Sequence, residues 1–190
     1  MSFDRRKEIL KAAYDSFSLF GYKATTIDQV ARLANVGKGT IYTYFKNKEE
    51  LLDEIITNLI NDMEKAADET LNPDKPFQEN VHQALYSMLE FRLDHQLTIK
   101  LGQEKRDIGT PVVENVMKKL ENSILLFIQD KIEQAIQRDV IKSCDPEVMA
   151  FMLLKMYVAL IFDWEKDRQP LSKEEIANIF DLYIFKGLSK

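Results

Sequence analysis

The chain has one cysteine among its 190 residues, and it lacks the motifs by which many enzymes are recognised. A single cysteine excludes an internal disulfide, and Cys144, alone near a helix start, is expected to be inert. The two histidines, His82 and His95, have no cysteine or acid at metal-ligand spacing, and the sequence shows no glycine-rich phosphate loop and no nucleophile elbow. We therefore expect no metal site, no cofactor and no enzymatic activity.

Apolar segments for targeting or anchoring are also missing. The start, MSFDRRKEILKAA, carries charges where a signal peptide would be apolar, which predicts a cytoplasmic protein. Residues 148–164 are apolar on every side, but the run is short for a bilayer and has Lys155 near its middle. We expect this helix to pack one face inside its own body and the other against a second subunit.

Charge is unevenly distributed along the chain. The formal net charge is −5, yet residues 1–48 carry nine Lys or Arg against four Asp or Glu, a net +5. The remaining residues carry 17 basic against 27 acidic side chains, a net −10. A basic head on an acidic body indicates a local surface for phosphate. Arg5, Arg6 and Lys7 could form a solvated first turn, but because a helix-turn-helix pattern follows them, we expect at least one to contact the backbone or minor groove of DNA.

The stretch 25–52 reads as two short helices joined by a tight turn. Apolar residues at three- and four-residue spacing predict one helix over 27–34, which Thr26 can cap. Asn35 and Gly37 tolerate the left-handed backbone of a sharp reversal. A second helix over 38–45 would bury Ile41 and Phe45.

The outward side of this second helix suits DNA, and the pair predicts a helix-turn-helix that places it in the major groove. Gly39 permits close approach, and hydroxyl groups can donate to phosphates. We expect Thr26 and the lysines to position phosphates, Gly39 and two threonines to face bases, and two tyrosines to grip the backbone. The candidate DNA-binding residues are Thr26, Lys38, Gly39, Thr40, Tyr42, Thr43, Tyr44, Lys46 and Lys48.

These residues carry a family resemblance. The run ARLANVGKGTIYTYF, followed by KNKEELL, resembles the DNA-binding domain of the TetR family of bacterial transcriptional regulators over residues 6–52. One departure is Asn35-Val36-Gly37, where the family often has Gly-Val-Ser, so a serine hydroxyl that would cap the helix or touch phosphate is absent. The resemblance implies a dimeric regulator, most often a repressor, with an effector-binding body.

The remaining periodicity predicts an all-α chain of about nine helices. Long helices are expected over 48–70, 77–95, 111–139 and 148–164, with a shorter one over 97–107 and a last one after Ser172. We expect a DNA-binding domain over 1–47 and an effector-binding and dimerisation domain over 48–190, with the helix 48–70 connecting them. The resemblance suggests that the segment 97–107 moves with ligand, which Gly102 permits.

Methionines and aromatics in the body can line an adaptable pocket, although such residues are more often plain core. We expect a small hydrophobic or amphipathic effector to bind there and release the repressor from its operator. Acidic residues of the body favour a cationic ligand, whereas Lys155 or Arg92 could receive a carboxylate, and the sequence does not choose. The candidate lining residues are Phe91, His95, Met117, Leu120, Met152, Tyr157 and Trp164.

The last two helices of each subunit could pair as a four-helix bundle, the dimer interface that the resemblance implies, through Leu153, Leu160, Ile161, Phe180, Tyr183 and Ile184. A twofold dimer holds its recognition helices roughly 34–36 Å apart, so the operator should be a near-palindrome. The sequence thus predicts a ligand-responsive DNA-binding regulator without a membrane partner. The alternative is a DNA-binding architectural or regulatory dimer without an effector.

Overall fold

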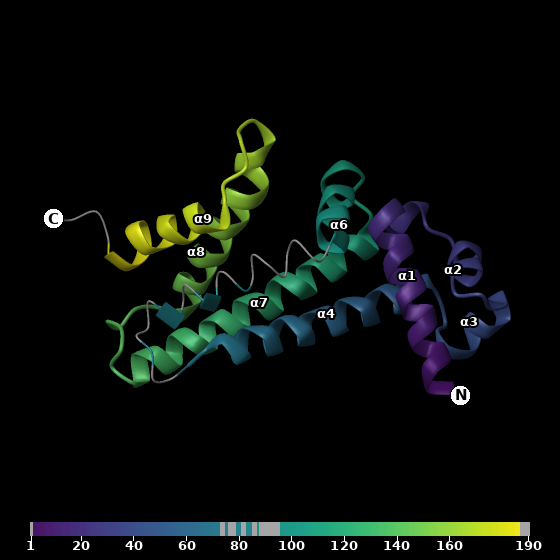
Figure 1. Cartoon of the computed structure of the whole chain (residues 1–190), viewed down its shortest axis with the longest axis horizontal. Coiled ribbons are helices and arrows are strands. Elements are labelled where there is room, and N and C mark those ends of the chain that lie inside the picture. Colours follow the sequence, from purple (N-terminus) through teal and green to yellow (C-terminus); the bar gives the residue numbers. More distant parts are fainter. Residues whose placement is uncertain are drawn as a thin grey trace. The chain divides into compact units, whose positions relative to one another are not determined.

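The computed structural model describes residues 2–72, 75, 79–80, 83–84, 87 and 96–186, and these ranges contain helices and connections but no strand. The α-helices among them are α1 (Ser2–Ala24), α2 (Ile27–Leu33), α3 (Lys38–Tyr44), α4 (Lys48–Thr70), α6 (Gln96–Asp107), α7 (Pro111–Gln137), α8 (Pro146–Val158) and α9 (Lys173–Phe180), as Figure 1 shows. The predicted all-α fold is confirmed. The helix predicted over 77–95 lies mostly outside the described residues.

The chain divides into two compact units. The first comprises residues 1–62 and 92–121, and the second comprises residues 63–91 and 122–190. These units are defined by packing alone. The predicted boundary between a DNA-binding domain (1–47) and an effector-binding and dimerisation domain (48–190) therefore stays a prediction.

Side-chain caps begin several helices where the sequence predicted them. Thr26 and Gln29 form a capping box at α2, and Ser172 and Glu175 form another at α9. The carboxylate of Asp145 accepts from the backbone N–H groups of Glu147 and Val148 at 3.0 and 3.1 Å, directly before Pro146 in α8. Such caps satisfy amides that have no partner inside the helix, which makes helix starts readable from local sequence.

The turn between α2 and α3 differs from its prediction at one residue. Asn35 has a left-handed backbone, with φ of 52°, as the reversal requires. Gly37 was expected to share this conformation but is extended, with φ of −73° and ψ of 148°, and it is the N-cap of α3 without a side-chain hydrogen bond. One left-handed residue therefore suffices for the reversal.

The core of the N-terminal helices lies in the first unit. Ile9, Ala13 and Phe17 of α1 have no exposed surface, and their spacing of four residues places them on one helical face. They share the first unit with the fully buried Val30, Ile41, Leu51 and Leu52 of the following three helices. Helix α1 also packs closely against α6.

The second unit has its own core in the C-terminal helices. Tyr157, Ile161, Ile176 and Phe180 form a buried cluster. The single helix predicted over 148–164 is wrong in detail, because α8 ends at Val158 and continues as the π-helical segment Ala159–Asp163 and the 3₁₀ turn Trp164–Lys166. A second π-helical segment, Asp181–Lys186, follows α9. Wider π turns rotate the following side chains relative to an α-helix, which changes the face that Ile161 presents.

Within the parts of the chain that the structure describes, we find no helix that is both long and apolar enough to cross a membrane.

Candidate nucleic-acid interface

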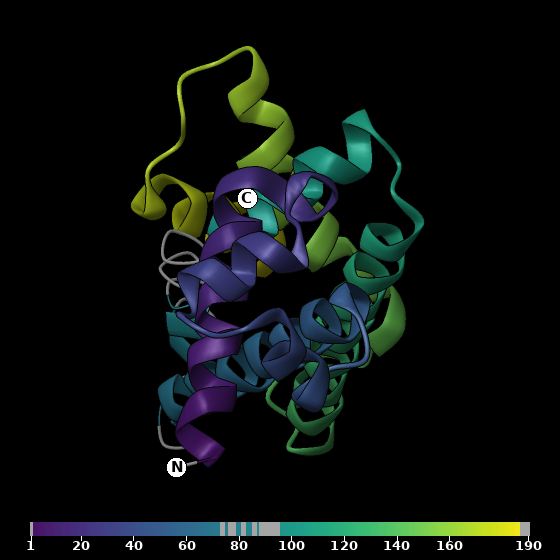
Figure 2. The same ribbon diagram turned by 90° about the vertical axis from the view of Figure 1, so that its right-hand side faces the viewer.

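Helix α3 is anchored on one side and open on the other. Ile41 and its C-cap residue Phe45 are buried, at 0% and 1% exposure, and fasten the helix to the first unit. Lys38, Gly39, Tyr42 and Thr43 are exposed. Figure 2 turns α1, α2 and α3 toward the viewer, with α2 and α3 on the outside of the unit. Two buried anchors on a seven-residue helix fix the direction in which its polar side points.

Gly39 leaves open space on this surface. A Cβ built at Gly39 meets no atom within 4 Å, apart from its neighbours along the chain and its own helix backbone. Packing within the chain therefore does not explain the glycine. A docked macromolecule could approach the α3 backbone most closely at this point.

Arg6 of α1 contacts both α4 and Phe45, the C-cap residue of α3. Both terminal nitrogens of its guanidinium donate to the two carboxylate oxygens of Glu54 in α4, and the same group lies 5.0 Å from the centre of the Phe45 ring. A bidentate arginine pair fixes direction as well as distance. The sequence predicted DNA contact for at least one residue of the cluster 5–7. For Arg6, the structure shows a clamp between α1, α4 and the end of α3.

The signal that could have identified this clamp is the position of Arg6 in the helix. Arg6 lies three residues before the buried Ile9, on the side of α1 that faces the protein. Its partner Glu54 is 48 residues away, so the pairing itself was not readable from local sequence. Arg5 pairs instead with Glu8 on the same helix, at 2.9 Å.

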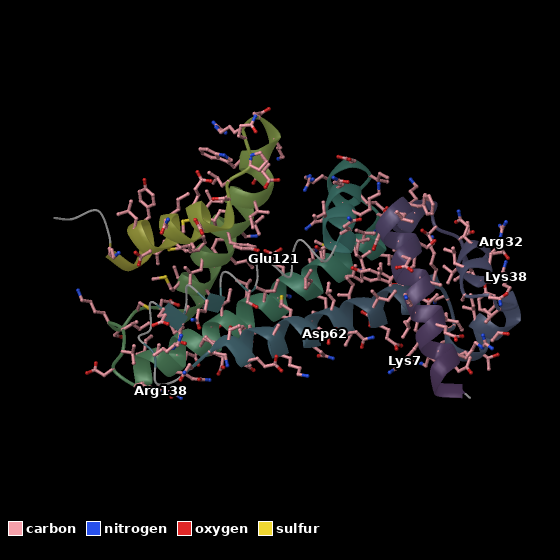
Figure 3. All side chains as sticks on the ribbon, in the orientation of Figure 1. Lys7, Arg32, Lys38, Asp62, Glu121 and Arg138 are labelled. Carbon is pink, nitrogen blue, oxygen red and sulfur yellow. The ribbon has the colours of Figure 1, made fainter. Side chains whose placement is uncertain are left out.

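Lys38 at the start of α3 is bound to Asp28 in α2. The lysine Nζ donates to Oδ2 of Asp28 at 2.9 Å, and both side chains are about half exposed. This hydrogen bond and the aspartate charge raise the pKa of Lys38 above its ordinary value. Figure 3 labels Lys38 and Arg32 on the side of α2 and α3 that faces away from α1. The carboxylate thus offsets one positive charge on this surface.

We expect Asp28→Asn to strengthen binding to DNA of any sequence. Removing the carboxylate leaves Lys38 fully available to a phosphate, so the slope of log affinity against log salt should steepen by about one unit. Fluorescence anisotropy with a random-sequence duplex over a salt series measures this slope. Lys38→Gln is the matched control and should make the slope shallower, and equal slopes in both variants would contradict the assignment.

The hydroxyl groups predicted to meet DNA are partly engaged in the free chain. Thr26 Oγ1 accepts from the backbone N–H of Gln29 at 3.2 Å, and Thr43 Oγ1 donates to the carbonyl of Gly39 at 3.1 Å. Thr40 and Tyr44 are half-buried, whereas Tyr42 is 49% exposed. The structure brings the predicted residues of α3 together on one short helix, with Tyr42 as its most exposed large apolar side chain.

The three predicted lysines lie in different surroundings. Lys46 is exposed in the link between α3 and α4, where its backbone N–H donates to Glu50 at 2.5 Å. Lys48 turns inward, and its Nζ donates to the carbonyls of Tyr22 and Thr25 at 2.7 Å each. Partial burial lowers the pKa of Lys48, although the charge of Glu104 acts against this shift. In the free chain Lys48 therefore stabilises the end of α1.

The predicted effector-lining residues fall in both units. Met117 and Leu120 belong to the first unit, and Met152, Tyr157 and Trp164 belong to the second, while Phe91 and His95 lie outside the described residues. Met152 is 50% exposed, and Tyr157 is buried in the C-terminal cluster. A hollow of about 450 Å³ lies elsewhere, at the starts of α4 and α7, lined by Lys46, Asn47, Glu49, Glu50, Asp53, Asn115, Val116 and Lys119.

The predicted dimer residues divide by exposure. Ile161 and Phe180 have no exposed surface, so both are taken up by the core of their own chain. Leu153, Leu160 and Ile184 are half-buried against the same cluster, and Tyr183 is 52% exposed. The sequence predicted that one face of the helix over 148–164 meets a second subunit, but the predicted interface residues did not include the exposed apolar stripe on α8. This stripe is formed by Val148, Phe151 and Met152 at spacings of three and one.

Models of two protein families match the chain. Residues 9–55 match "Bacterial regulatory proteins, tetR family", and residues 74–188 match "Tetracyclin repressor-like, C-terminal domain". The chain is 61% identical over 189 residues to the uncharacterized HTH-type transcriptional regulator YhgD of Bacillus subtilis (strain 168), which covers 100% of this chain and 99% of that protein.

Solved structures share the fold at lower identity. FadR from Bacillus subtilis, in complex with stearoyl-CoA, superposes with a TM-score of 0.73 at 20% identity, covering 92% of each chain. AibR, in complex with isovaleryl coenzyme A and operator DNA, superposes with a TM-score of 0.64 at 23% identity, covering 92% of this chain and 94% of that one. With the matched families and the exposed face of α3, these findings identify the chain as a helix-turn-helix transcriptional regulator of the TetR family.

Proposed function

We propose that this chain is a homodimeric repressor that leaves a near-palindromic operator when an amphipathic small molecule binds its C-terminal domain. The observation that carries the DNA-binding part is the open face of α3, where none of the residues that the structure describes fills the space beside Gly39. Ile41 and Phe45 hold this face in place from below. Lys38, Lys46 and Thr26 contact phosphates, Gly39, Thr40 and Thr43 face bases, and Tyr42 and Tyr44 contact the sugar-phosphate backbone.

The dimer is proposed to form through the exposed apolar residues of the C-terminal helices. Phe151 and Met152 on α8 and Tyr183 beyond α9 are each about half exposed and belong to the same unit. A twofold interface pairs each of these patches with itself. Burying them in a second copy removes apolar surface from water, which favours association. Ile161 and Phe180 support this surface from within.

Two relatives in the same fold suggest the chemical class of the effector. FadR was solved with stearoyl-CoA, and AibR was solved with isovaleryl coenzyme A. Both ligands join an apolar acyl chain to a strongly anionic head, so they are amphipathic. An acyl-coenzyme A is therefore the first class of effector to test with this chain.

The test begins with selection of DNA from a random-sequence pool by the purified chain. We expect enrichment of a near-palindrome, bound by two copies of the protein in native mass spectrometry. Adding acyl-coenzyme A of increasing chain length should then release this DNA in an anisotropy titration, with free coenzyme A as the control. Enrichment of DNA without release by any acyl chain would favour a regulator of the same architecture that lacks this effector, and the absence of enrichment would contradict DNA binding itself.

A further inference from the structure

A buried carboxylate lies on the face of α6 that the protein covers. Leu97, Leu101 and Glu104 are the buried residues of this helix, at spacings of four and three, so they share one face. The first two are apolar, but the third is an acid with only 6% of its surface exposed. Burying a charged group is costly unless hydrogen bonds replace the lost water. The DNA-facing surface does not account for Glu104.

Glu104 finds its partners in α1 and at the start of α7. Its Oε1 accepts from the backbone N–H of Lys23 at 3.0 Å and from Oγ1 of Thr110 at 2.9 Å, and its Oε2 accepts from the same Lys23 N–H at 3.2 Å. The Lys23 amide follows Gly21, where α1 leaves helical geometry. The carboxylate of α6 therefore serves the last turn of α1 as a side-chain cap serves a helix start.

The backbone at Gly21 has the shape that this carboxylate requires. Its φ of +81° lies in the region that only glycine adopts readily. A Cβ at Gly21 would lie 2.6 Å from Oε2 of Glu104, closer than side-chain atoms approach one another. The conformation therefore requires glycine, and any larger side chain would also displace the carboxylate from the Lys23 amide. This contact is specific, since a loosely packed surface acid would place no such demand on its neighbour.

The same turn is held from its other side by α4. Nζ of Lys48 donates to the carbonyls of Tyr22 and Thr25 and lies 4.2 Å from the centre of the Tyr22 ring. The buried hydroxyl of Thr25 donates to the carbonyl of Gly21 at 2.7 Å. Residues 21–25 are thus fixed by a carboxylate from α6 and an ammonium group from α4. The next residue is Thr26, which caps the first helix of the helix-turn-helix.

From this arrangement we infer that Glu104 is the positioning residue through which α6 fixes the orientation of the helix-turn-helix, and with it the half-site spacing that the dimer accepts. The inference rests on the proposed binding of a palindrome by a dimer. Its physical basis is that Glu104 joins a segment of the C-terminal family match to the amide of Lys23 in the last turn of α1, three residues before Thr26 caps α2. Without this contact, α2 and α3 can adopt a wider range of orientations relative to α6.

The test compares affinity for the near-palindrome that the wild-type chain enriches with affinity for duplexes whose half-sites are moved apart by one or two base pairs. We define the spacing penalty as the ratio of the affinity for the original duplex to the affinity for a duplex with altered spacing. We expect Glu104→Ala to bind the original duplex about tenfold more weakly, and its spacing penalty to be smaller than that of the wild type by a similar factor. Glu104→Gln should restore the spacing penalty, because its amide can accept from Lys23 and donate to Thr110. Asp107→Ala, which removes an exposed acid from the same helix, is the matched control and should change neither quantity.

A folded Glu104→Ala chain with the wild-type spacing penalty would overturn the inference. Circular dichroism establishes whether each variant is folded. If Glu104→Ala does not fold, Thr110→Val removes one donor and leaves the carboxylate in place, and it should reduce the spacing penalty about threefold. In that case, a folded Thr110→Val chain with the wild-type spacing penalty would also overturn the inference. If the wild-type chain enriches no DNA, the proposed function itself fails and the inference falls with it.

Discussion

Replacing Gly39 with leucine should weaken specific DNA binding about 100-fold or more while leaving the free protein at least as stable as the wild type. The side chain would project into space where a Cβ meets no atom within 4 Å, so the fold accommodates it. Leucine also has a higher helix propensity than glycine, worth about 1 kcal/mol. On DNA the same side chain would hold the α3 backbone away from the base edges, and we expect affinity for the enriched palindrome to fall about 100-fold or more, corresponding to about 3 kcal/mol.

Gly39→Ala should give an intermediate result, with a small gain in thermal stability and about a tenfold loss of affinity. The matched control is Gly102→Ala in α6, where the added methyl would lie 3.8 Å from the side chain of Arg106, an ordinary contact. It should gain stability in the same way and bind DNA normally. Anisotropy and thermal unfolding on the same preparations separate the two effects. Wild-type affinity in Gly39→Leu would show that α3 does not enter the groove at this residue.

Charging the exposed stripe of α8 should convert the dimer into monomers. In Phe151→Glu/Met152→Glu, two carboxylates replace apolar side chains that are each 50% exposed in the single chain. A self-paired interface would then bury four carboxylates. Lys155, whose Nζ lies 5.3 Å from the centre of the Phe151 ring, can offset at most one of them in each copy, so association is opposed. Because binding of the second half-site depends on the first through the dimer, affinity for the palindrome should fall about 100-fold. Affinity for a single half-site should change little.

Val140→Glu provides the control for this experiment. Val140 is 50% exposed and belongs to the same unit, but it lies in the connection between α7 and α8 rather than on the α8 stripe. It should remain dimeric in native mass spectrometry. If the double variant stays dimeric, the interface does not lie on the α8 stripe. If Val140→Glu also dissociates, the interface includes the connection between α7 and α8.

Much of the architecture was predictable because its signals are local. The start of α2 at Ile27 and of α4 at Lys48 agrees with prediction, since a cap and the first turn lie within four residues of each other. The fold class followed from periodicity over each helix. The π-helical segments did not, because the apolar pattern around Ile161 suits either helical geometry and only packing in the C-terminal core selects one.

Side-chain roles were predictable only where the partner is near in sequence. Lys38 on the outside of α3 followed from helical spacing, but its pairing with Asp28 depends on the crossing of α2 and α3. Lys48 was predicted from its charge to meet phosphate, and in the free chain it contacts carbonyls more than 20 residues earlier in the sequence. A charge in the sequence indicates what a residue can bind, whereas tertiary contacts select its partner.

The sequence by itself determined the all-α class, the helix-turn-helix and the outward side of α3 at Lys38, Gly39, Tyr42 and Thr43, because capping and helical periodicity act over a few neighbouring residues. Only the tertiary structure decided that Arg6 clamps Glu54 and that Glu104 meets the amide of Lys23, 81 residues away. Contacts of this range form only when whole helices pack. Their energy depends on burial and geometry, which no local pattern encodes.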